Sequence, residues 1–269
     1  MTPTRIAIAG LGAIGRTLAA KIAGGAIPGT TLACVAARDE AKAKAWLAAE
    51  GIVAPVVPLS EFPALADLAV ECAPAAVIEE ICTPMLTAGK RVMVLSCGAL
   101  LPRPHLMELA KAHGGQIIVP TGALLGLDAV TAAAEGTIHS VRMITRKPPK
   151  GLVGAPYLVE KGLDMDAITE PTLIFSGTAR EAAKGFPANV NVAVALSLAG
   201  IGPDRTTIDI WADPTVTRNC HAIEVDSDSA KLSLAIENIP SDNPKTGRIT
   251  ALSVIAALRK LNAPVRVGT

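Results

Sequence analysis

The sequence predicts an α/β fold, in which a doubly wound parallel sheet is followed by a second, α+β domain built on a mixed or antiparallel sheet. Short apolar strands alternate with helical segments over the first 120 residues, which is the rhythm of βαβ units. Beyond residue 120, consecutive strands are joined by short turns, which favours antiparallel pairing. The 269 residues also approach the size at which a single hydrophobic core stops growing. We therefore expect two domains, the first of Rossmann type.

The first domain is expected to span residues 1–120. Its predicted strands are the apolar runs at 5–10, 32–37, 53–58, 68–73, 91–98 and 116–120. Its predicted helices lie between them, at 13–25, 39–50, 74–89 and 103–115. Strands of a parallel sheet are buried on both faces and therefore read as nearly continuous apolar runs, as these do.

The second domain is expected to span residues 121–245, with substrate binding and dimerisation as its roles. Predicted strands lie at 138–149, 172–177, 206–214, 218–225 and 231–239. Predicted helices lie at 121–136, where a loop leads into the helix, and at 178–186 and 189–200. The remaining segment, 246–269, is predicted to form a helix at 247–262 and a closing strand at 264–267, and to pack back on the first domain.

Composition excludes several classes of function. A formal net charge of +1 and only six aromatic side chains argue against a nucleic-acid partner, which calls for a basic patch or stacking platforms. No apolar run approaches the ~20 residues that a membrane span requires. The amino terminus leads into a strand without a signal peptide, so a cytoplasmic location is expected. The five cysteines and four histidines show no disulfide framework or metal-ligand spacing, and no metal is predicted.

A glycine fingerprint follows the first strand and opens the first helix. Gly10 permits a tight turn, Gly12 lets backbone approach a pyrophosphate, and Gly15 allows close packing of helix on strand. Ala13 and Ile14 complete the turn, where the N–H groups of the helix amino terminus attract phosphate. This context predicts binding of NAD or NADP, although a glycine-rich turn in a ligand-free fold would show the same spacing.

The second strand ends in an arginine and an acidic residue, which leaves the choice of dinucleotide open. Arg38 suits the 2′-phosphate of NADP, because a guanidinium forms a planar, bidentate contact with phosphate. Asp39 suits the ribose 2′-hydroxyl of NAD. Alternatively, Arg38 is an exposed charge at the entry to a helix.

Small residues mark the carboxyl ends of later strands, where a doubly wound fold binds its ligand. Cys72 and Ala73 follow one strand and Ala123 follows another, and each would let a nicotinamide ribose lie close to backbone. The alternative is that strand-to-helix loops are simply rich in small residues.

The strand at 218–225 places polar and apolar side chains on one face. Successive side chains alternate in a strand, so Asn219, His221, Ile223 and Val225 point the same way. Burying an unpaired polar group costs about 1–3 kcal/mol. The amide and imidazole are therefore either satisfied inside the core or face a pocket.

The chain resembles the L-aspartate dehydrogenase family, which feeds NAD biosynthesis, in a series of motifs that run nearly from end to end. These are the fingerprint, VECA, SCGAL, GALLGLDA, RKPP, GTAREAAKGFPANVNVAVALSLAGIG, ADP with RNCH, and ENIPSDNPKTG. The resemblance implies NAD(P)-dependent oxidation of L-aspartate to iminoaspartate, which yields oxaloacetate and ammonia or supplies quinolinate synthesis. It also implies a homodimer. Independently of the resemblance, the open sheet of the second domain is expected to pair or pack with another subunit, since sheet faces must be covered.

The resemblance also assigns roles to particular residues. It implies that His221 is the active-site histidine, that Ala123 and Asn189 contact the cofactor, and that Asn219, Lys245 and Thr246 surround the substrate. Lys147 is a second candidate for the substrate carboxylates, with an exposed charge at a strand end as the alternative. Gly247 departs from the family, where serine is usual.

Other functions stay open on the sequence alone. A related two-domain reductase acting on another small amino or hydroxy acid is one, although the His-His pair of dihydrodipicolinate-reductase-like proteins is absent. Another is a dinucleotide sensor without turnover, although no basic recognition helix is evident.

Overall fold

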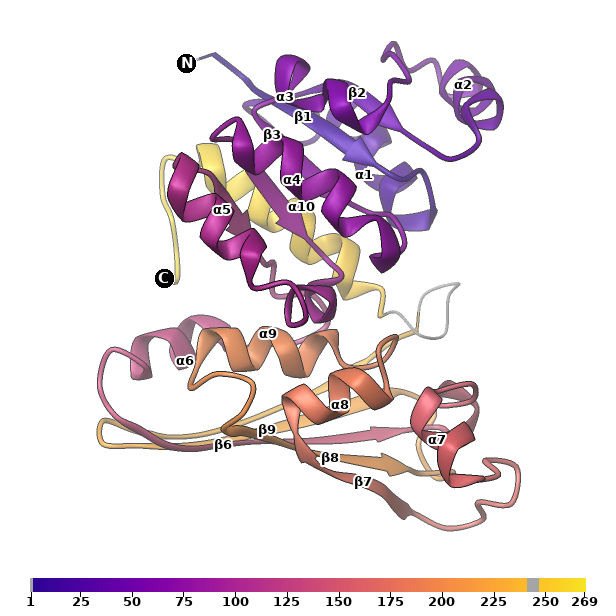
Figure 1. Ribbon diagram of the computed structural model, residues 1–269, viewed down its shortest axis with the longest axis vertical. Coiled ribbons are helices and arrows are strands. Elements are labelled where there is room, and N and C mark those ends of the chain that lie inside the picture. The colour runs from indigo at the N-terminus through magenta and orange to yellow at the C-terminus, as the bar shows by residue number, and fades with distance from the viewer. Residues whose placement is uncertain (1, 241–246) are drawn as a thin grey trace. The chain divides into compact units, whose positions relative to one another are not determined.

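The computed structural model describes residues 2–240 and 247–269, which divide into two compact units. Unit 1 comprises Met1–Pro120 and Ala251–Arg266, and unit 2 comprises Thr121–Thr250 and Val267–Thr269. Figure 1 labels the elements of both units.

Unit 1 is built on a five-stranded, all-parallel sheet with the order β2-β1-β3-β4-β5. Its strands are β1 (Thr4–Ala9), β2 (Thr30–Ala36), β3 (Leu68–Glu71), β4 (Arg91–Val94) and β5 (Gln116–Ile118). Its helices are α1 (Ala13–Ala23), α2 (Glu40–Ala49), α3 (Phe62–Leu65), α4 (Ile78–Thr87), α5 (His105–His113) and α10 (Ile249–Asn262), with short 3-10 turns η1 (Leu59–Glu61), η2 (Ala75–Val77) and η3 (Cys97–Leu100). This arrangement confirms the predicted Rossmann-type sheet.

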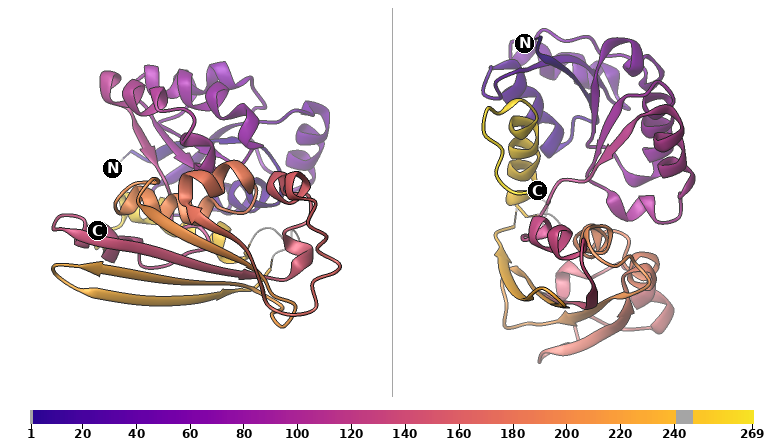
Figure 2. Two further views of the ribbon diagram at one scale, coloured as in Figure 1. Left: turned by 60° about the horizontal axis from the view of Figure 1, so that its bottom comes forward. Right: turned by 90° about the vertical axis from the view of Figure 1, so that its left-hand side faces the viewer.

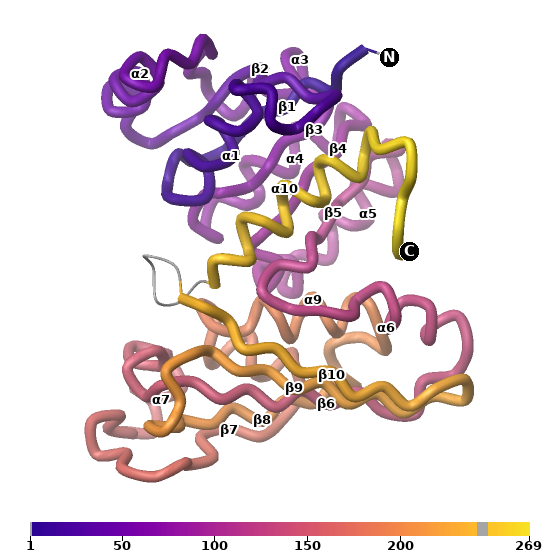
Figure 3. Tube along the Cα trace, turned by 180° about the vertical axis from the view of Figure 1, so that it is seen from behind, coloured from indigo at the N-terminus to yellow at the C-terminus, as the bar shows by residue number. Residues whose placement is uncertain are grey.

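Helices cover both faces of the unit 1 sheet. Figures 2 and 3 show α10 on the face opposite α4 and α5. On the α10 side, Leu18 of α1 and Val254 and Leu258 of α10 join the strand side chains in one core. Asn262, at the end of α10, donates to the carbonyl of Gly29 at 2.9 Å and so ties the carboxyl-terminal helix to the start of β2.

Unit 2 is built on a mixed sheet with the order β10-β9-β6-β8-β7, in which β6 and β8 are parallel and the other neighbours antiparallel. Its strands are β6 (Ile138–Lys147), β7 (Thr172–Thr178), β8 (Thr206–Ala212), β9 (Asn219–Ser227) and β10 (Lys231–Asn238). Its helices are α6 (Leu127–Ala133), α7 (Pro156–Lys161), α8 (Ala179–Gly185) and α9 (Asn191–Ala199), with the 3-10 turn η4 (Pro149–Gly151). The predicted α+β class is thus confirmed for this part of the chain.

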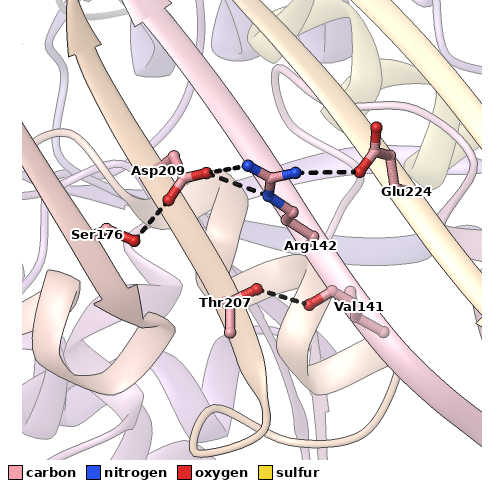
Figure 4. A network of polar contacts seen from close by, with 6 residues as sticks. All are labelled: Val141, Arg142, Ser176, Thr207, Asp209 and Glu224. Atoms are coloured by element: carbon pink, nitrogen blue, oxygen red, sulfur yellow. Dashed lines mark hydrogen bonds and ion pairs between the residues drawn. The ribbon is translucent and has the colours of Figure 1, made fainter. Parts of the chain in front are cut away.

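Strand alternation gives the unit 2 sheet two different faces. Figures 1 and 2 show α6, α8 and α9 on one face, which carries apolar side chains such as Val141 and Met143 of β6. On the other face, Arg142 donates to Asp209 at 2.6 and 3.1 Å and lies 3.6 Å from Glu224 (Figure 4). The charges that point away from the helices are therefore paired across strands.

Two predicted strands are wrong. Residues 53–58 make only an isolated bridge, between Val35 and Val56, because Pro55 and Pro58 have no N–H to give to a ladder. Residues 264–267 form no strand either; Val265 and Val267 are 74% and 84% exposed, and no sheet edge is paired with them. The segment 150–170, left unassigned from the sequence, contains α7.

Candidate functional site

The glycine turn between β1 and α1 has the backbone shape of a phosphate cradle. Gly10 has φ of +99°, a conformation that L side chains rarely adopt, and its N–H donates to Ala36 at 2.7 Å. At the start of α1, Gly12 is the N-cap residue and no side chain caps the helix. No acidic residue lies in the first turn of α1, so nothing negative competes there with a phosphate.

The three glycines differ in what an added side chain would meet. A Cβ at Gly15 would lie 1.9 Å from the carbonyl oxygen of Gly10, and one at Gly10 would lie 2.6 Å from that of Cys72. A Cβ at Gly12 would meet nothing within 4 Å. Gly10 and Gly15 are thus needed by the fold itself, whereas Gly12 borders open space of the kind that a pyrophosphate needs. The residues present fit a nicotinamide dinucleotide.

At the end of β2, the two candidate specificity residues are used differently. Asp39 is the N-cap of α2, and its carboxylate accepts from the N–H of Lys42 at 2.9 Å. Arg38 is exposed and is not the residue that caps α2. The structure therefore leaves the guanidinium, more than the carboxylate, available for a ribose substituent.

Beyond β3, a buried carboxylate organises the next loop. Glu71 is fully buried, and one of its oxygens accepts the N–H groups of Leu95 at 3.0 Å and Ser96 at 2.8 Å. Burial raises the pKa of Glu71, and these hydrogen bonds oppose the rise. Cys72 and Ala73, predicted to contact cofactor, directly follow this anchor, and burial raises the pKa of the Cys72 thiol, which stays protonated.

In unit 2, one end of the sheet carries a buried polar cluster on the helix-covered face. Register places Thr145 opposite His221, and His221 opposite Ile236. Lys147 follows Thr145 by two residues in β6, and Asn219 precedes His221 by two residues in the antiparallel β9, so both lie on the same face at the same end of the sheet. The apolar face of the sheet thus turns polar within its last two rows.

His221 is 4% exposed and its ring Nδ1 lies 3.2 Å from the hydroxyl oxygen of Thr145. Its pKa is lowered to about 3, first by burial and then by the positive charge of Lys147. The imidazole is therefore neutral near pH 7. With Nδ1 facing Thr145, Nε2 is the ring atom that can address a substrate.

Lys147 connects two of the predicted site residues. It is 4% exposed, and its ammonium lies 3.1 Å from Oδ1 and 3.3 Å from the backbone oxygen of Asn189. The positive charge of the same ammonium also lowers the pKa of His221. Lys147 is therefore part of the cluster, and the alternative of an exposed strand-end charge is wrong.

Asn219 and Ala123 join the same cluster through a residue not predicted from the sequence, Asn238. Register pairs Asn238 of β10 with Asn219, and Asn238 Nδ2 donates to the carbonyl of Ala123 at 2.9 Å. The Asn238 Oδ1 is buried and has no hydrogen-bond partner among the residues that the structure describes. A Cβ at Gly247, the departure from the family pattern, would lie 3.1 Å from that oxygen.

The structure thus gathers Ala123, Asn189, Asn219 and His221 at one end of the unit 2 sheet. The fingerprint residues, Arg38, Cys72 and Ala73 lie in unit 1. Lys245 and Thr246 lie outside the described residues.

Thr145 and Asn238 are the residues that sequence reasoning missed, and alternation along β6 and β10 would have placed both on the inner face. Within the described chain, no three His, Cys, Asp or Glu side chains gather as metal ligands. No helix among the described residues is long and apolar enough to cross a membrane.

Comparison with known proteins identifies both parts of the chain. Residues 128–261 match the family model of the aspartate dehydrogenase C-terminal domain, and residues 10–120 match that of the homoserine dehydrogenase NAD-binding domain. The chain is 61% identical over 264 residues to L-aspartate dehydrogenase 3 of Bordetella bronchiseptica, covering 98% of this chain and 97% of that protein. It is 59% identical to the L-aspartate dehydrogenase of Bradyrhizobium diazoefficiens, covering 98% and 94%.

A solved structure agrees with these relatives. The crystal structure of aspartate dehydrogenase from Thermotoga maritima is similar with a TM-score of 0.73 and 26% identity, over 98% of this chain and 99% of that one. Similarity at this level, over nearly the full length of each protein, shows that the chain belongs to the L-aspartate dehydrogenase family.

Proposed function

We propose that this chain oxidises L-aspartate with NAD or NADP, giving iminoaspartate, the reduced dinucleotide and a proton. Water then converts the imine to oxaloacetate and ammonia, unless quinolinate synthesis consumes it first. The observation that carries the proposal is His221, a buried neutral imidazole held by Thr145 in the unit 2 polar cluster of a chain from this family.

The substrate must lose an ammonium proton before its Cα can release a hydride, and we assign that proton to Nε2 of His221. A histidine with a pKa of about 3 is a weak base on its own. The two carboxylates of aspartate change this, because negative charge beside the ring favours the imidazolium and raises the pKa of His221. Substrate binding would thus prepare its own proton acceptor.

Asn219 supplies neutral donors for the carboxylates, and Lys245 and Thr246 remain proposed contacts on the strength of the family pattern. When bound, the dinucleotide supplies the hydride acceptor. Its phosphates would be held by the N–H groups at Gly12, Ala13 and Ile14, with Gly10 and Gly15 shaping the turn. Cys72, Ala73, Ala123 and Asn189 are the proposed contacts near its nicotinamide end.

Both dinucleotides are proposed as cofactors, with Arg38 favouring NADP. Asp39 is engaged as a helix cap, whereas Arg38 is exposed. Arg38→Ala should therefore lower kcat/KM for NADP about tenfold or more and leave that for NAD nearly unchanged.

We further propose that unit 1 binds the dinucleotide, that unit 2 binds the substrate and mediates homodimerisation, and that the enzyme acts in the cytoplasm. The helices of unit 2 lie on one sheet face (Figures 1 and 2). On the other face, Leu173 pairs with Trp211 and is 45% exposed. Light scattering coupled to size exclusion tests for the dimer, and a monomer at micromolar concentration would contradict it.

The activity is tested by the initial rate of NAD and NADP reduction with L-aspartate, beside D-aspartate, L-glutamate and L-homoserine. The expected result is selective oxidation of L-aspartate that falls at least a hundredfold in His221→Ala. His105→Ala is the matched control, because that histidine is exposed and pairs with Glu79 in unit 1. Dinucleotide binding without oxidation of any substrate would favour the sensor alternative.

A further inference from the structure

The contact between Lys147 and Asn189 fixes which way the Asn189 amide points. An ammonium is a donor only, so the amide atom 3.1 Å from Lys147 Nζ is the oxygen, Oδ1. The backbone oxygen of Asn189 faces the same ammonium at 3.3 Å. The amide nitrogen, with its two N–H groups, therefore points away from Lys147.

The backbone around Asn189 is held as well. The Asn189 N–H donates to the carbonyl of Phe186 at 2.9 Å, in the turn that precedes α9. Phe186 is fully buried and packs against Tyr157 and Phe175. Asn189 is thus anchored through its N–H, its carbonyl and Oδ1, and Nδ2 is the polar atom that these contacts do not use.

Burial of Lys147 carries a cost in stability. Removing a charge from water is costly, and well-packed apolar residues often replace buried ion pairs without loss of stability. Lys147 adds to this cost by lying beside His221, whose protonation it opposes. This cost favours a role for Lys147 in the site, through its contact with Asn189.

We propose that Lys147 is a positioning residue that holds Asn189 so that it presents N–H donors, and that the group recognised there is an acceptor oxygen of the nicotinamide dinucleotide. The inference rests on the proposed function for the identity of that ligand. It assigns a polarity to the contact: Asn189 donates, and an oxygen of the cofactor accepts.

Asn189→Asp tests the polarity directly, because it changes one amide nitrogen for oxygen. The carboxylate keeps an acceptor for Lys147 but loses both N–H donors. We expect the Kd for NADP and for NAD, measured by titration calorimetry without substrate, to rise about tenfold or more. The midpoint of urea unfolding should not fall.

Lys147→Met tests the positioning role, and Lys147→Arg tests whether a donor in the same place restores it. We expect Lys147→Met to weaken dinucleotide binding about tenfold and Lys147→Arg to recover part of the loss. The double variant Lys147→Met/Asn189→Asp should have a Kd no higher than that of the single variant that binds dinucleotide less tightly, since both substitutions act on one contact. Lys150→Met, at an exposed lysine three residues on, is the control and should bind as wild type does.

Two results would overturn the inference. One is wild-type affinity in Asn189→Asp, which would mean that the amide donates nothing to the cofactor. The other is a Lys147→Met protein that unfolds more easily yet binds dinucleotide normally, which would make Lys147 purely structural. Dinucleotide binding is measured without turnover, so the two proposals can fail separately. If the protein does not oxidise aspartate but Asn189→Asp and Lys147→Met still weaken dinucleotide binding, the proposed function is overturned and this inference stands.

Discussion

The lowered pKa of His221 predicts that unit 2 loses stability in mild acid. Unfolding returns the imidazole to its ordinary pKa of 6.5, while in the folded protein the pKa is about 3. Between these values the unfolded chain binds a proton that the folded chain does not, so stability falls as pH falls from 6.5 towards 3. At pH 5 the loss from this one group is about 2 kcal/mol relative to pH 8.

Tryptophan fluorescence can follow this loss in unit 2. The chain has two tryptophans, Trp46 on α2 and Trp211 on β8. In a Trp46→Phe background, Trp211 reports unit 2 alone, and urea unfolding at pH 8 and pH 5 gives the change in the free energy of unfolding. His221→Asn is the matched comparison, because it keeps a polar group near Thr145 but does not titrate.

We expect the His221 protein to lose about 2 kcal/mol more than the His221→Asn protein between the two pH values. Other titrating groups contribute to both proteins and cancel in the difference. Equal losses would refute the reasoning, because they would mean that the folded protein protonates His221 as easily as the unfolded chain does.

Three further predictions concern single positions. Gly15→Ala should destabilise unit 1 by about 1–3 kcal/mol through its clash with backbone, whereas Gly12→Ala should leave urea unfolding unchanged and weaken NAD binding in calorimetry at least tenfold. Gly247→Ser should raise the free energy of unfolding by about 1 kcal/mol by giving Asn238 Oδ1 a donor, and Gly247→Ala, which has no hydroxyl, should show no gain. Burial raises the pKa of Glu71, so the free energy of unfolding should fall as pH rises from the pKa of this group in the unfolded chain to its pKa in the folded protein. Glu71→Gln should abolish that decline, which the fluorescence of Trp46 in unit 1 can monitor. A variant that keeps the decline would show that another group causes it.

Local patterns predicted most of the fold because they reflect backbone geometry. The apolar runs with intervening helices specified the parallel sheet, and alternation placed Asn219 and His221 together on one strand face. The same rule misled at residues 53–58, where hydrophobicity suggested a strand and the prolines at 55 and 58 prevented it.

The composition of the site was harder to predict, because it depends on contacts between residues distant in sequence. Thr145 and His221 meet across 76 positions, and nothing near Thr145 in the sequence indicates a partner. Lys147 and Asn189 meet across 42 positions, so a lysine at a strand end appeared equally consistent with solvent exposure. Strand pairing decides these contacts, and the sequence does not state the pairing.

The most direct test of the account is the fate of the hydrogen on Cα of aspartate. L-aspartate deuterated at Cα is incubated with the protein and NAD or NADP, and the reduced dinucleotide is analysed by mass spectrometry. The account predicts a dinucleotide that carries one deuterium, formed in equal amount with oxaloacetate and ammonia, and at least a hundredfold more slowly in His221→Ala. Reduced dinucleotide without deuterium, or none at all, would contradict hydride transfer from aspartate.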